Sequence, residues 1–339
     1  MVLKVGLIGY RNHAQRLIDI INSNHNSNLM YIFHPTKKFD DPLFTTNFDN
    51  LLTCDVVVVS SPNNTHFNYL QKLQNFKGYI FCEKPPSRDV AGIIEVINEE
   101  KKHPGQKLMY GFNHRYHDSI LEALSIVRSK ELGEIINLRG VYGKSQLITF
   151  NQTDWRTKRD IAGGGVLLDQ GIHMVDLMRL FAGEFVDIYS FIENSYWNYD
   201  VEDNAYALMR TKNGTVAMLN SSATQWRHRF HLDINLEKGS LVLGGILSGS
   251  KSYGVETLTI VYANPEDDQG DPKMVTTNYN IDPSWCAEIK EFSDCILNNR
   301  KITSGTAHDA LQTMKLVYKI YYADKKWQQT YNIKNPDIE

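Results

Sequence analysis

The alternation of short β-rich runs with helical patterns over the first third of the chain is the feature that most constrains the fold. Apolar runs occur at Val5–Ile8, Leu29–Phe33, Asp55–Val59 and Gly78–Cys82, and apolar residues recur at helical spacing between several of them. The third run is continuous and β-branched, which is typical of a strand that is covered on both faces. Strands joined through helices require parallel crossovers, so the pattern predicts an open, doubly wound parallel sheet.

The pattern changes after residue 115, and strands predominate from Ile135 to Tyr262. In the segment Phe230–Leu236, apolar residues alternate strictly with His, Asp and Asn, which predicts a sheet with one buried and one wet face. Lys212-Asn213-Gly214 and Lys238-Gly239 predict hairpin turns, because Asn and Gly adopt positive φ at little cost. We therefore expect a second domain with a large, mostly antiparallel open sheet, closed by two C-terminal helices.

The length of the chain supports this division. With 339 residues it is longer than most single hydrophobic cores can organise. The expected fold is thus α/β, with a nucleotide-binding parallel sheet in residues 1–118 and a substrate-binding and oligomerisation domain in residues 119–339.

The composition excludes several classes of partner. The 36 Lys and Arg residues nearly balance the 39 Asp and Glu residues, which gives no electrostatic reason to expect a nucleic acid or an anionic membrane. No apolar stretch approaches the roughly 20 residues of a membrane-spanning helix. The N-terminal residues predict a first strand and not a signal peptide. The four cysteines show no zinc-ligand spacing, so we expect buried thiols, no metal, and a cytoplasmic, soluble protein.

The segment Gly9-Tyr10-Arg11-Asn12-His13-Ala14 lies where the first strand meets the first helix. A dinucleotide site at that junction needs a tight turn, a close backbone approach to the pyrophosphate and tight helix packing. Gly9 supplies the first and Ala14 the third, whereas Arg11 takes the place of the middle glycine. Its guanidinium is able to contact a phosphate directly. The alternative is an ordinary strand–helix connection.

The end of the second strand bears on the choice of cofactor. A carboxylate there binds the adenosine ribose 2′-hydroxyl of NAD. This chain has His34-Pro35-Thr36-Lys37-Lys38 instead, and the hydroxyl of Thr36 and the ammonium of Lys37 suit a 2′-phosphate. The sequence therefore favours NADP slightly over NAD, and the alternative is an ordinary solvated turn.

Lys84 follows the run Gly78–Cys82, at the carboxyl end of the predicted parallel sheet, where ligands bind. The proline that follows restricts its backbone toward extended geometry, which fixes where its side chain leaves the strand. An ammonium there can hold a substrate hydroxyl or a developing alkoxide and lower the pKa of that hydroxyl. The alternative is a surface lysine before a turn.

The stretch from Gly163 to Asp176 carries the second candidate for chemistry. Asp169, His173 and Asp176 are spaced i, i+4 and i+7, which places them on one face of a helix. A carboxylate one turn from an imidazole can orient it and stabilise its protonated form. The preceding glycines allow a loop or ligand to approach the helix start closely. The alternative is a helix-capping Asp beside a buried polar His.

Together these motifs resemble the Gfo/Idh/MocA family, named for glucose–fructose oxidoreductase, inositol dehydrogenase and a protein of rhizopine catabolism. The resemblance covers nearly the whole chain, and several motifs in the right order are far more specific than any one alone. The matching motifs are the glycine turn, Ser60-Ser61-Pro62-Asn63-Asn64-Thr65-His66, Glu83-Lys84-Pro85, Asn113-His114-Arg115-Tyr116, Trp155-Arg156 and the Gly163–Asp176 block.

The resemblance implies an N-terminal Rossmann domain that binds NAD(P), and a C-terminal α/β domain whose open sheet forms the interface of a homodimer or homotetramer. It also implies a catalytic set of Lys84, Asp169 and His173. The expected cofactor contacts are Gly9, Tyr10, Arg11, Asn12, His13, Thr36, Lys37, Ser60, Ser61, Pro62, Asn64, His66, Glu83, Lys84 and Asn113. The expected substrate contacts are Lys84, Arg115, Tyr116, Trp155, Arg156, Asp169 and His173.

The resulting hypothesis is reversible hydride transfer between the nicotinamide of NAD(P) and a carbinol carbon of a sugar or sugar derivative. In the oxidation direction His173 takes the hydroxyl proton and Lys84 stabilises the alkoxide, and the sequence leaves open which of the two is the proximal proton carrier. Aromatic and cationic residues near Trp155-Arg156-Thr157-Lys158-Arg159 and Trp226-Arg227-His228-Arg229 favour a nucleotide-linked or acidic sugar.

Two alternatives to this hypothesis stay open. An enzyme that retains NAD(P) can carry out elimination, epimerisation or glycoside cleavage of a sugar without net redox change. The second alternative is a protein without catalytic activity that senses a sugar or the cofactor. The joint presence of Lys84, Asp169 and His173 argues against it.

Overall fold

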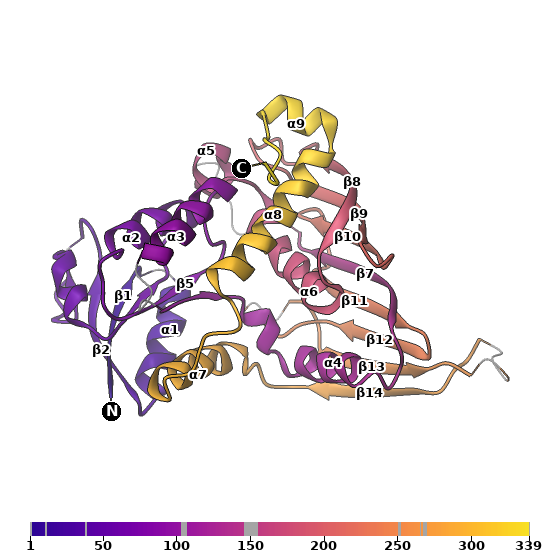
Figure 1. Ribbon diagram of the computed structural model, residues 1–339, viewed down its shortest axis with the longest axis horizontal. Coiled ribbons are helices and arrows are strands. Elements are labelled where there is room, and N and C mark those ends of the chain that lie inside the picture. Colours follow the sequence, from indigo (N-terminus) through magenta and orange to yellow (C-terminus); the bar gives the residue numbers. More distant parts are fainter. Residues whose placement is uncertain are drawn as a thin grey trace. The chain divides into compact units, whose positions relative to one another are not determined.

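The computed structural model describes residues 2–10, 12–37, 39–102, 107–145, 155–249, 252–264, 266 and 270–338. The chain divides into two compact units, each with its own sheet (Figure 1). The first unit consists of Met1–Asn113 and Trp285–Met314, and the second of His114–Ser284 and Lys315–Glu339. The sequence placed everything after residue 118 in one C-terminal domain, whereas residues 285–314 fold with the N-terminal unit.

A six-stranded parallel sheet with the order β3-β2-β1-β4-β5-β6 forms the centre of the first unit. Its strands are β1 (Leu3–Ile8), β2 (Ser27–Phe33), β3 (Phe44–Thr45), β4 (Val56–Val59), β5 (Tyr79–Glu83) and β6 (Lys107–Gly111). Helix α1 (Asn12–Ser23) covers one face, and α2 (His66–Lys72) and α3 (Val90–Lys102) cover the other (Figure 1). All four residues of β4 are buried, as a strand covered on both faces requires. The predicted doubly wound parallel sheet is confirmed.

Helix α7 (Ser284–Leu297) and the start of α8 (Ala307–Ala323) complete the first unit. Phe292 of α7 packs against Phe81 of β5 with ring centroids 5.6 Å apart. The guanidinium of Arg16 in α1 lies 5.3 Å from the centroid of the Trp285 ring. The apolar face of α7 therefore packs against the parallel sheet, which explains why this late segment joins the first unit.

An eight-stranded sheet with the order β14-β13-β12-β11-β7-β10-β9-β8 forms the second unit. Strands β7 and β10 pair in parallel, and the other neighbours pair antiparallel. The strands are β7 (Ile135–Gly143), β8 (Phe185–Glu193), β9 (Asn204–Thr211), β10 (Val216–Ser222), β11 (Arg229–Leu236), β12 (Gly239–Gly244), β13 (Glu256–Tyr262) and β14 (Met274–Tyr279). The predicted large, mostly antiparallel sheet is confirmed.

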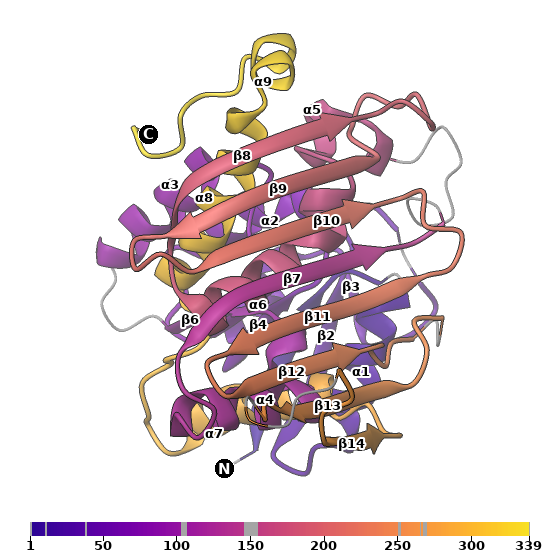
Figure 2. The ribbon, with the colours of Figure 1, turned by 90° about the vertical axis from the view of Figure 1, so that its right-hand side faces the viewer.

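The helices of the second unit lie on one face of this sheet, and Figure 2 shows the opposite face. Helix α6 (Ile172–Ala182) packs on β7 and β10, and α4 (Asp118–Ser129) packs on β12 and β13. In β11 the apolar residues from Phe230 to Leu236 are buried beneath the helices, while His231, Asp233 and Asn235 alternate with them and are only partly buried. The one-sided pattern predicted for this strand is confirmed.

The remaining elements are short. They are α5 (Arg159–Ala162), α9 (Lys325–Tyr331), the 3₁₀ turns η1 (Phe48–Thr53), η2 (Asn63–Thr65), η3 (Asn113–Tyr116) and η4 (Trp155–Thr157), and the π-helical turn η5 (Leu167–Gly171). Helix α9 is an addition to the two closing helices that we expected. It begins because Asp324 accepts a hydrogen bond from the backbone N–H of Trp327 at 2.9 Å.

None of the helices in the described part of the chain is long and apolar enough to cross a membrane. Among the same residues, no group of three or more His, Cys, Asp or Glu side chains is arranged to hold a metal ion. None of the four cysteines forms a disulfide. Cys54, Cys82 and Cys295 are buried as expected, whereas Cys286 is exposed because it lies on the solvent side of α7.

A single buried carboxylate, that of Glu202, holds the glycine-rich turn that precedes α6. It accepts hydrogen bonds from the backbone N–H groups of Gly165 (2.7 Å) and Leu167 (2.9 Å) and from the hydroxyl of Tyr321 (2.6 Å). Burial raises the pKa of Glu202, and nearby Arg159 and these hydrogen bonds offset only part of that effect. The turn is tightly packed, since a Cβ at Gly165 would lie 2.1 Å from the Glu202 carbonyl oxygen. Glu202 therefore fixes where the π-helical turn and α6 begin.

We expect Glu202→Ala to lower the free energy of unfolding by about 3–5 kcal/mol, because three buried donors lose their acceptor. Tyr321→Phe removes one of the three hydrogen bonds and is expected to cost about 1 kcal/mol. The control is Glu131→Ala, at an exposed position, with an expected change within about 0.5 kcal/mol. Urea titration of the three variants measures these values. A decrease in the free energy of unfolding below about 1 kcal/mol for Glu202→Ala would contradict the role of Glu202 as the acceptor that holds this turn.

Candidate active site

The carboxyl edge of the parallel sheet carries the glycine turn predicted to hold a dinucleotide. Gly9 follows β1 with φ +115°, and a Cβ there would lie 2.4 Å from the carbonyl oxygen of Ser60, which follows β4. Strands β1 and β4 are neighbours at the point where the strand order reverses, the usual ligand position in such sheets. Helix α1 begins at Asn12, so its N-terminus follows the turn directly. A glycine turn, a close backbone approach and a helix N-terminus fit a pyrophosphate.

The structure describes only part of the three predicted cofactor contacts that follow Tyr10 at this turn. The side chains of Asn12 and His13 are not described, and Arg11 lies outside the described residues. Ser60 is buried and Ser61 half-buried; the Ser61 hydroxyl oxygen accepts a hydrogen bond from Thr65 at 2.7 Å.

His66 ties the loop after β4 to the loop after β5. Its Nε2 lies 2.8 Å from the carbonyl oxygen of Ser61, and its Nδ1 lies 2.8 Å from the carbonyl oxygen of Pro85. Burial lowers the pKa of His66, while the two carbonyl oxygens act in the opposite direction. Both ring nitrogens of His66 are therefore held by backbone carbonyl oxygens, and one of these carbonyls belongs to Pro85, the residue after Lys84.

The end of β5 carries two of the predicted residues. Glu83 is buried as the last residue of the strand. Lys84 is the next residue, and the peptide bond between Lys84 and Pro85 is cis. Asn113, at the end of β6, is buried as well. Because these strands are parallel neighbours, Glu83 and Asn113 lie at the same edge of the sheet as Gly9 and Ser60.

The end of β2 presents an imidazole where a carboxylate would select NAD. The Nδ1 of His34 accepts the backbone N–H groups of Lys37 (2.9 Å) and Thr36 (3.3 Å). Its proton therefore sits on Nε2. Burial, with a further contribution from Lys37, lowers the pKa of His34, so the ring is a neutral donor. Tyr10 packs beside this turn against Phe39, with the rings tilted by 59° and centroids 4.9 Å apart, and edge-to-face against Phe44 at 4.7 Å.

In the second unit, the π-helical turn and the first turn of α6 carry Asp169 and His173. The sequence predicted one continuous helix here, and the π turn replaces its first part. The imidazole of His173 stacks on that of His114, with centroids 3.7 Å apart and planes 14° from parallel. The Nε2 of His114 lies 3.0 Å from the Tyr142 hydroxyl, whose pKa burial raises well above its usual value. His173 thus has a fixed ring plane among buried polar groups.

Asp169 lies between two cations. Its carboxylate oxygens are 3.8 Å from Nζ of Lys144 and 3.7 Å from Nε of Arg156. The Arg156 guanidinium in turn lies 4.5 Å from the centroid of the Trp155 ring. The structure therefore brings together three predicted residues of the second unit, Trp155, Arg156 and Asp169, with Lys144 as an additional member.

Arg115, a predicted substrate contact, is held by Asp176. The guanidinium donates from Nε (2.6 Å) and from one terminal nitrogen (2.5 Å) to the two carboxylate oxygens, and both side chains are buried. This pair fastens η3 to α6, which sets His114 against His173. Tyr116, the next residue of η3, is partly buried.

Gln170, Ser145, Ser252 and Tyr253, which sequence reasoning missed, lie in the same region, together with His228 of the predicted stretch Trp226-Arg227-His228-Arg229. The amide nitrogen of Gln170 donates to the Tyr253 hydroxyl at 2.7 Å. The ring nitrogens of His228 lie 3.0 Å from Oγ of Ser145 and 2.6 Å from Oγ of Ser252. The available signal was their position at the end of a strand or in the stretch Gly244–Gly254, which is rich in Gly and Ser, but only the folded sheet brings these segments together.

Arg159 was grouped with Arg156 as a cation for sugar or phosphate, but its surroundings are aromatic. Its guanidinium lies over the rings of Tyr321, Trp327 and Tyr331, at 5.3, 5.4 and 4.4 Å from their centroids. It therefore joins α5 to α8 and α9 as part of the packing of this unit.

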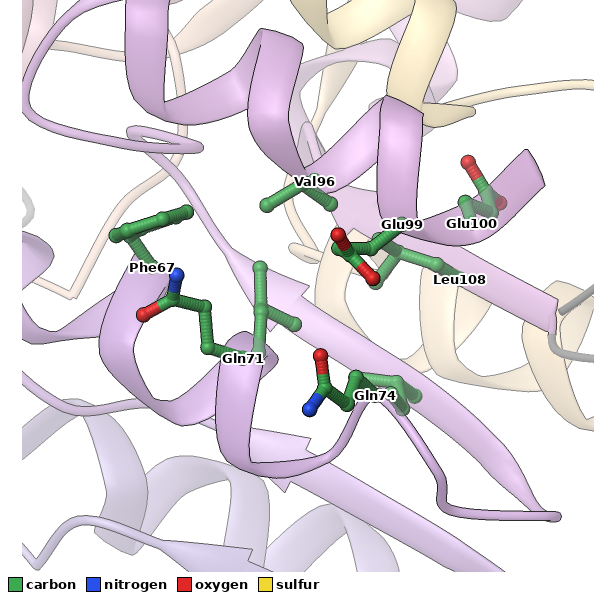
Figure 3. A pocket seen from close by; sticks show the side chains of 9 residues that line it. Phe67, Gln71, Gln74, Val96, Glu99, Glu100 and Leu108 are labelled. Carbon is green, nitrogen blue, oxygen red and sulfur yellow. The ribbon is translucent and has the colours of Figure 1, made fainter. Parts of the chain in front are cut away.

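A separate pocket lies between α2 and α3 in the first unit (Figure 3). Its lining is Phe67, Leu70, Gln71, Gln74, Ile80, Val96, Glu99, Glu100 and Leu108. Burial raises the pKa of Glu100. The lining contains none of the predicted site residues, which lie at the carboxyl edge of the parallel sheet in the first unit and around Asp169 and His173 in the second.

Comparisons with known proteins agree with this arrangement. The model of an oxidoreductase family with an NAD-binding Rossmann fold matches residues 3–112, and the model of the GFO/IDH/MocA C-terminal domain matches residues 120–242. The chain is 25% identical to myo-inositol 2-dehydrogenase of Thermotoga maritima over 253 residues, which are 70% of this chain and 68% of that protein.

Two further relatives are informative. D-glucoside 3-dehydrogenase of Escherichia coli is 28% identical over 186 residues, 50% of this chain and 52% of that protein. The crystal structure of aldose–aldose oxidoreductase from Caulobacter crescentus, complexed with glycerol, superposes with a TM-score of 0.81 at 22% identity, covering 96% of this chain and 98% of that one. The chain therefore belongs to the Gfo/Idh/MocA family of oxidoreductases, with an NAD-binding Rossmann fold.

Proposed function

We propose that the protein is an NAD(P)-dependent dehydrogenase or reductase that transfers a hydride between the nicotinamide and a carbinol carbon of a sugar or sugar derivative. The observation that carries the proposal is the stacking of His173 on His114, which holds the imidazole in a fixed plane; four residues earlier in the chain, Asp169 lies between two cations. Relatives named inositol and glucoside dehydrogenases support a ring hydroxyl as the reacting group.

The residues of this chain then take the following roles. When bound, the nicotinamide supplies or accepts the hydride. In the oxidation direction His173 takes the hydroxyl proton, Asp169 favours its protonated form, and Lys84 stabilises the alkoxide through its ammonium. In the reduction direction the proton moves back from His173 to the oxygen. His114 keeps the His173 ring in its plane, and the Arg115–Asp176 pair keeps His114 in place.

The cofactor is held by the first unit. The turn at Gly9 with the start of α1 takes the pyrophosphate, the loop from Ser60 to His66 lines the nicotinamide half, and Glu83 and Asn113 lie at the same edge. We propose NADP in preference to NAD. The support is the Nε2–H donor of His34 beside Thr36 and Lys37, in place of a carboxylate that would repel a 2′-phosphate.

A nucleotide-linked or acidic sugar is the proposed substrate class. The stacked pair Trp155–Arg156 offers an aromatic face for a sugar ring and a cation for an anionic group. We keep the cytoplasm as the proposed location, in keeping with the absence of disulfides among its four cysteines.

The open face of the eight-stranded sheet is the proposed oligomer interface, in a homodimer or a homotetramer. Figure 2 shows strands β8 and β9 side by side on this face. Tyr189 and Phe191 of β8 are each 74% exposed, and they pair across the strands with Leu208 and Tyr206 of β9. Met218 of β10 continues the row beside Leu208. An exposed apolar patch of this kind is typical of a surface that a second copy covers.

Lys84→Met and His173→Phe should each lower kcat by about 10²–10⁴-fold, because each removes a group that acts on the reacting oxygen. The affinity for NAD(P)H should change less than twofold, since neither group is assigned to the pyrophosphate or the adenosine. Lys101→Met, at an exposed position of α3, is the matched control. Absorbance of the reduced nicotinamide measures turnover, and calorimetry measures cofactor affinity.

Near-normal turnover in either variant would remove that residue from the mechanism. Sugar conversion by the wild type without accumulation of reduced nicotinamide would instead identify the retained-cofactor reaction. Absence of any cofactor binding would identify the sensor.

Lys37→Glu should weaken NADPH binding by about tenfold or more and leave NADH binding within about twofold, because only NADPH presents a phosphate to this turn. Calorimetric titration of wild type and variant with both cofactors measures this. Tighter binding of NADH than of NADPH by the wild type would contradict the preference.

Leu208→Arg should shift the wild-type oligomer to monomer at micromolar concentration, because a like-charge pair replaces apolar contact across a two-fold interface. Leu121→Arg, at an exposed apolar residue of α4 away from the open face, should leave the assembly unchanged. Light scattering after size-exclusion chromatography gives the masses. A monomeric wild type would rule out this interface.

A further inference from the structure

We propose that Tyr142 is a positioning residue for the proton transfer at His173, and that it acts through His114. This inference rests on the proposed function, because it concerns the group that exchanges the hydroxyl proton. Tyr142 was not among the residues predicted from the sequence. It is buried near the end of β7, and all three residues belong to the second unit.

The first argument is the freedom of a histidine ring. The torsion about the Cβ–Cγ bond of histidine has broad minima, so the backbone alone does not fix the plane of the imidazole. The Arg115–Asp176 pair fastens η3, the turn that carries His114, to α6. The orientation of the His114 ring needs a contact of its own. The Tyr142 hydroxyl supplies one, 3.0 Å from Nε2, at the end of the ring remote from Cβ.

The second argument is the rigidity of Tyr142 itself. Strand β7 lies inside the sheet, paired with β10 on one side and with β11 on the other. The ring of Tyr142 packs edge-to-face against Phe230 and Tyr253, with centroids 5.3 and 5.4 Å away. The hydroxyl of Tyr253 in turn accepts a hydrogen bond from Gln170. A side chain on a strand, locked by packed neighbours, positions another group more precisely than a loop residue does.

The third argument is that the two imidazoles move together. Their planes lie 14° from parallel with centroids 3.7 Å apart, which is van der Waals contact. A large turn of His114 about its Cβ–Cγ bond would drive the edge of its ring into the face of His173 or open a gap between the rings. The orientation that Tyr142 gives His114 is therefore passed to His173, whose ring nitrogen must meet the substrate hydroxyl at hydrogen-bond distance.

Tyr142 makes this hydrogen bond as a neutral group. Burial raises the pKa of its hydroxyl well above the usual value, and the nearby Tyr253 hydroxyl adds to that effect. The phenol therefore keeps its proton over the pH range of an activity assay and does not act as a base. Its role is to orient, so removal of the hydroxyl should affect the rate through the rings of His114 and His173.

The first test is a double-mutant cycle on turnover. The substrate is whichever of D-glucose, D-galactose, D-glucuronate and D-glucose 6-phosphate the wild type oxidises fastest with NADP⁺. Tyr142→Phe should lower kcat by about 10- to 100-fold, because misplacement of a reacting group has effects of that size. KM for the sugar should stay within about twofold. In a His114→Phe background, which lacks the ring nitrogen, Tyr142→Phe should change kcat by less than about twofold.

Tyr279→Phe is the matched control, because it removes the hydroxyl that Tyr279 of β14 donates to Glu122. Strand β14 is the edge strand of the same sheet and is separated from β7 by β13, β12 and β11. The control should leave kcat within about twofold of the wild type. A Tyr142→Phe kcat within about twofold of the wild type, or an equal loss in the wild-type and His114→Phe backgrounds, would overturn the proposal.

The second test observes the rings directly and does not depend on turnover. NMR of protein labelled with ¹³C-histidine detects the ring protons of His173, which the variant His173→Phe identifies. The stacked ring of His114 shifts these signals, and His114→Ala removes that shift. In Tyr142→Phe the signals should move toward their His114→Ala positions, and in Tyr279→Phe they should stay at the wild-type positions. Signals that Tyr142→Phe leaves unmoved would also overturn the proposal.

The two proposals fail separately. Absence of reduced nicotinamide with every one of these sugars would count against the proposed function. The NMR comparison would then decide alone whether Tyr142 orients the two rings.

Discussion

The second unit depends on one buried carboxylate. Glu202 accepts three hydrogen bonds, two from the backbone of the glycine-rich turn and one from Tyr321 of α8. Burying a carboxylate is unfavourable and raises the pKa of Glu202, and the three donors offset part of that cost. Because the turn leads into the π-helical turn and then into α6, the position of the Glu202 side chain determines where Asp169 and His173 stand.

A second buried interaction sets the surroundings of His173. The two-point contact between Arg115 and Asp176 joins η3 to α6, and a planar guanidinium on a planar carboxylate permits little rotation. His114 precedes Arg115 and stacks on His173. An imidazole held in one plane presents its nitrogen atoms in fixed directions, which is what proton transfer to a bound hydroxyl requires.

The first unit uses backbone geometry in place of ion pairs. Gly9 adopts a positive φ and leaves no room for a Cβ against the Ser60 carbonyl, so strands β1 and β4 end close together. His66 links the next two loops through their carbonyl oxygens. These contacts order the edge of the sheet before any ligand arrives, which lowers the entropy that binding must remove. In our proposal this edge holds the dinucleotide, while the polar cluster of the second unit holds the sugar.

The sequence by itself determined the two sheets, because a continuous β-branched run such as Val56–Val59 and a strict alternation such as Phe230–Leu236 each fit one kind of burial. It also determined the order of the motifs and hence the family. Tertiary structure alone decided that Lys144 and Arg156 flank Asp169, that Asp176 holds Arg115, and that α7 joins the first unit. The reason is that periodicity records which face of an element is buried, whereas pairing between residues far apart in the chain depends on how the elements pack.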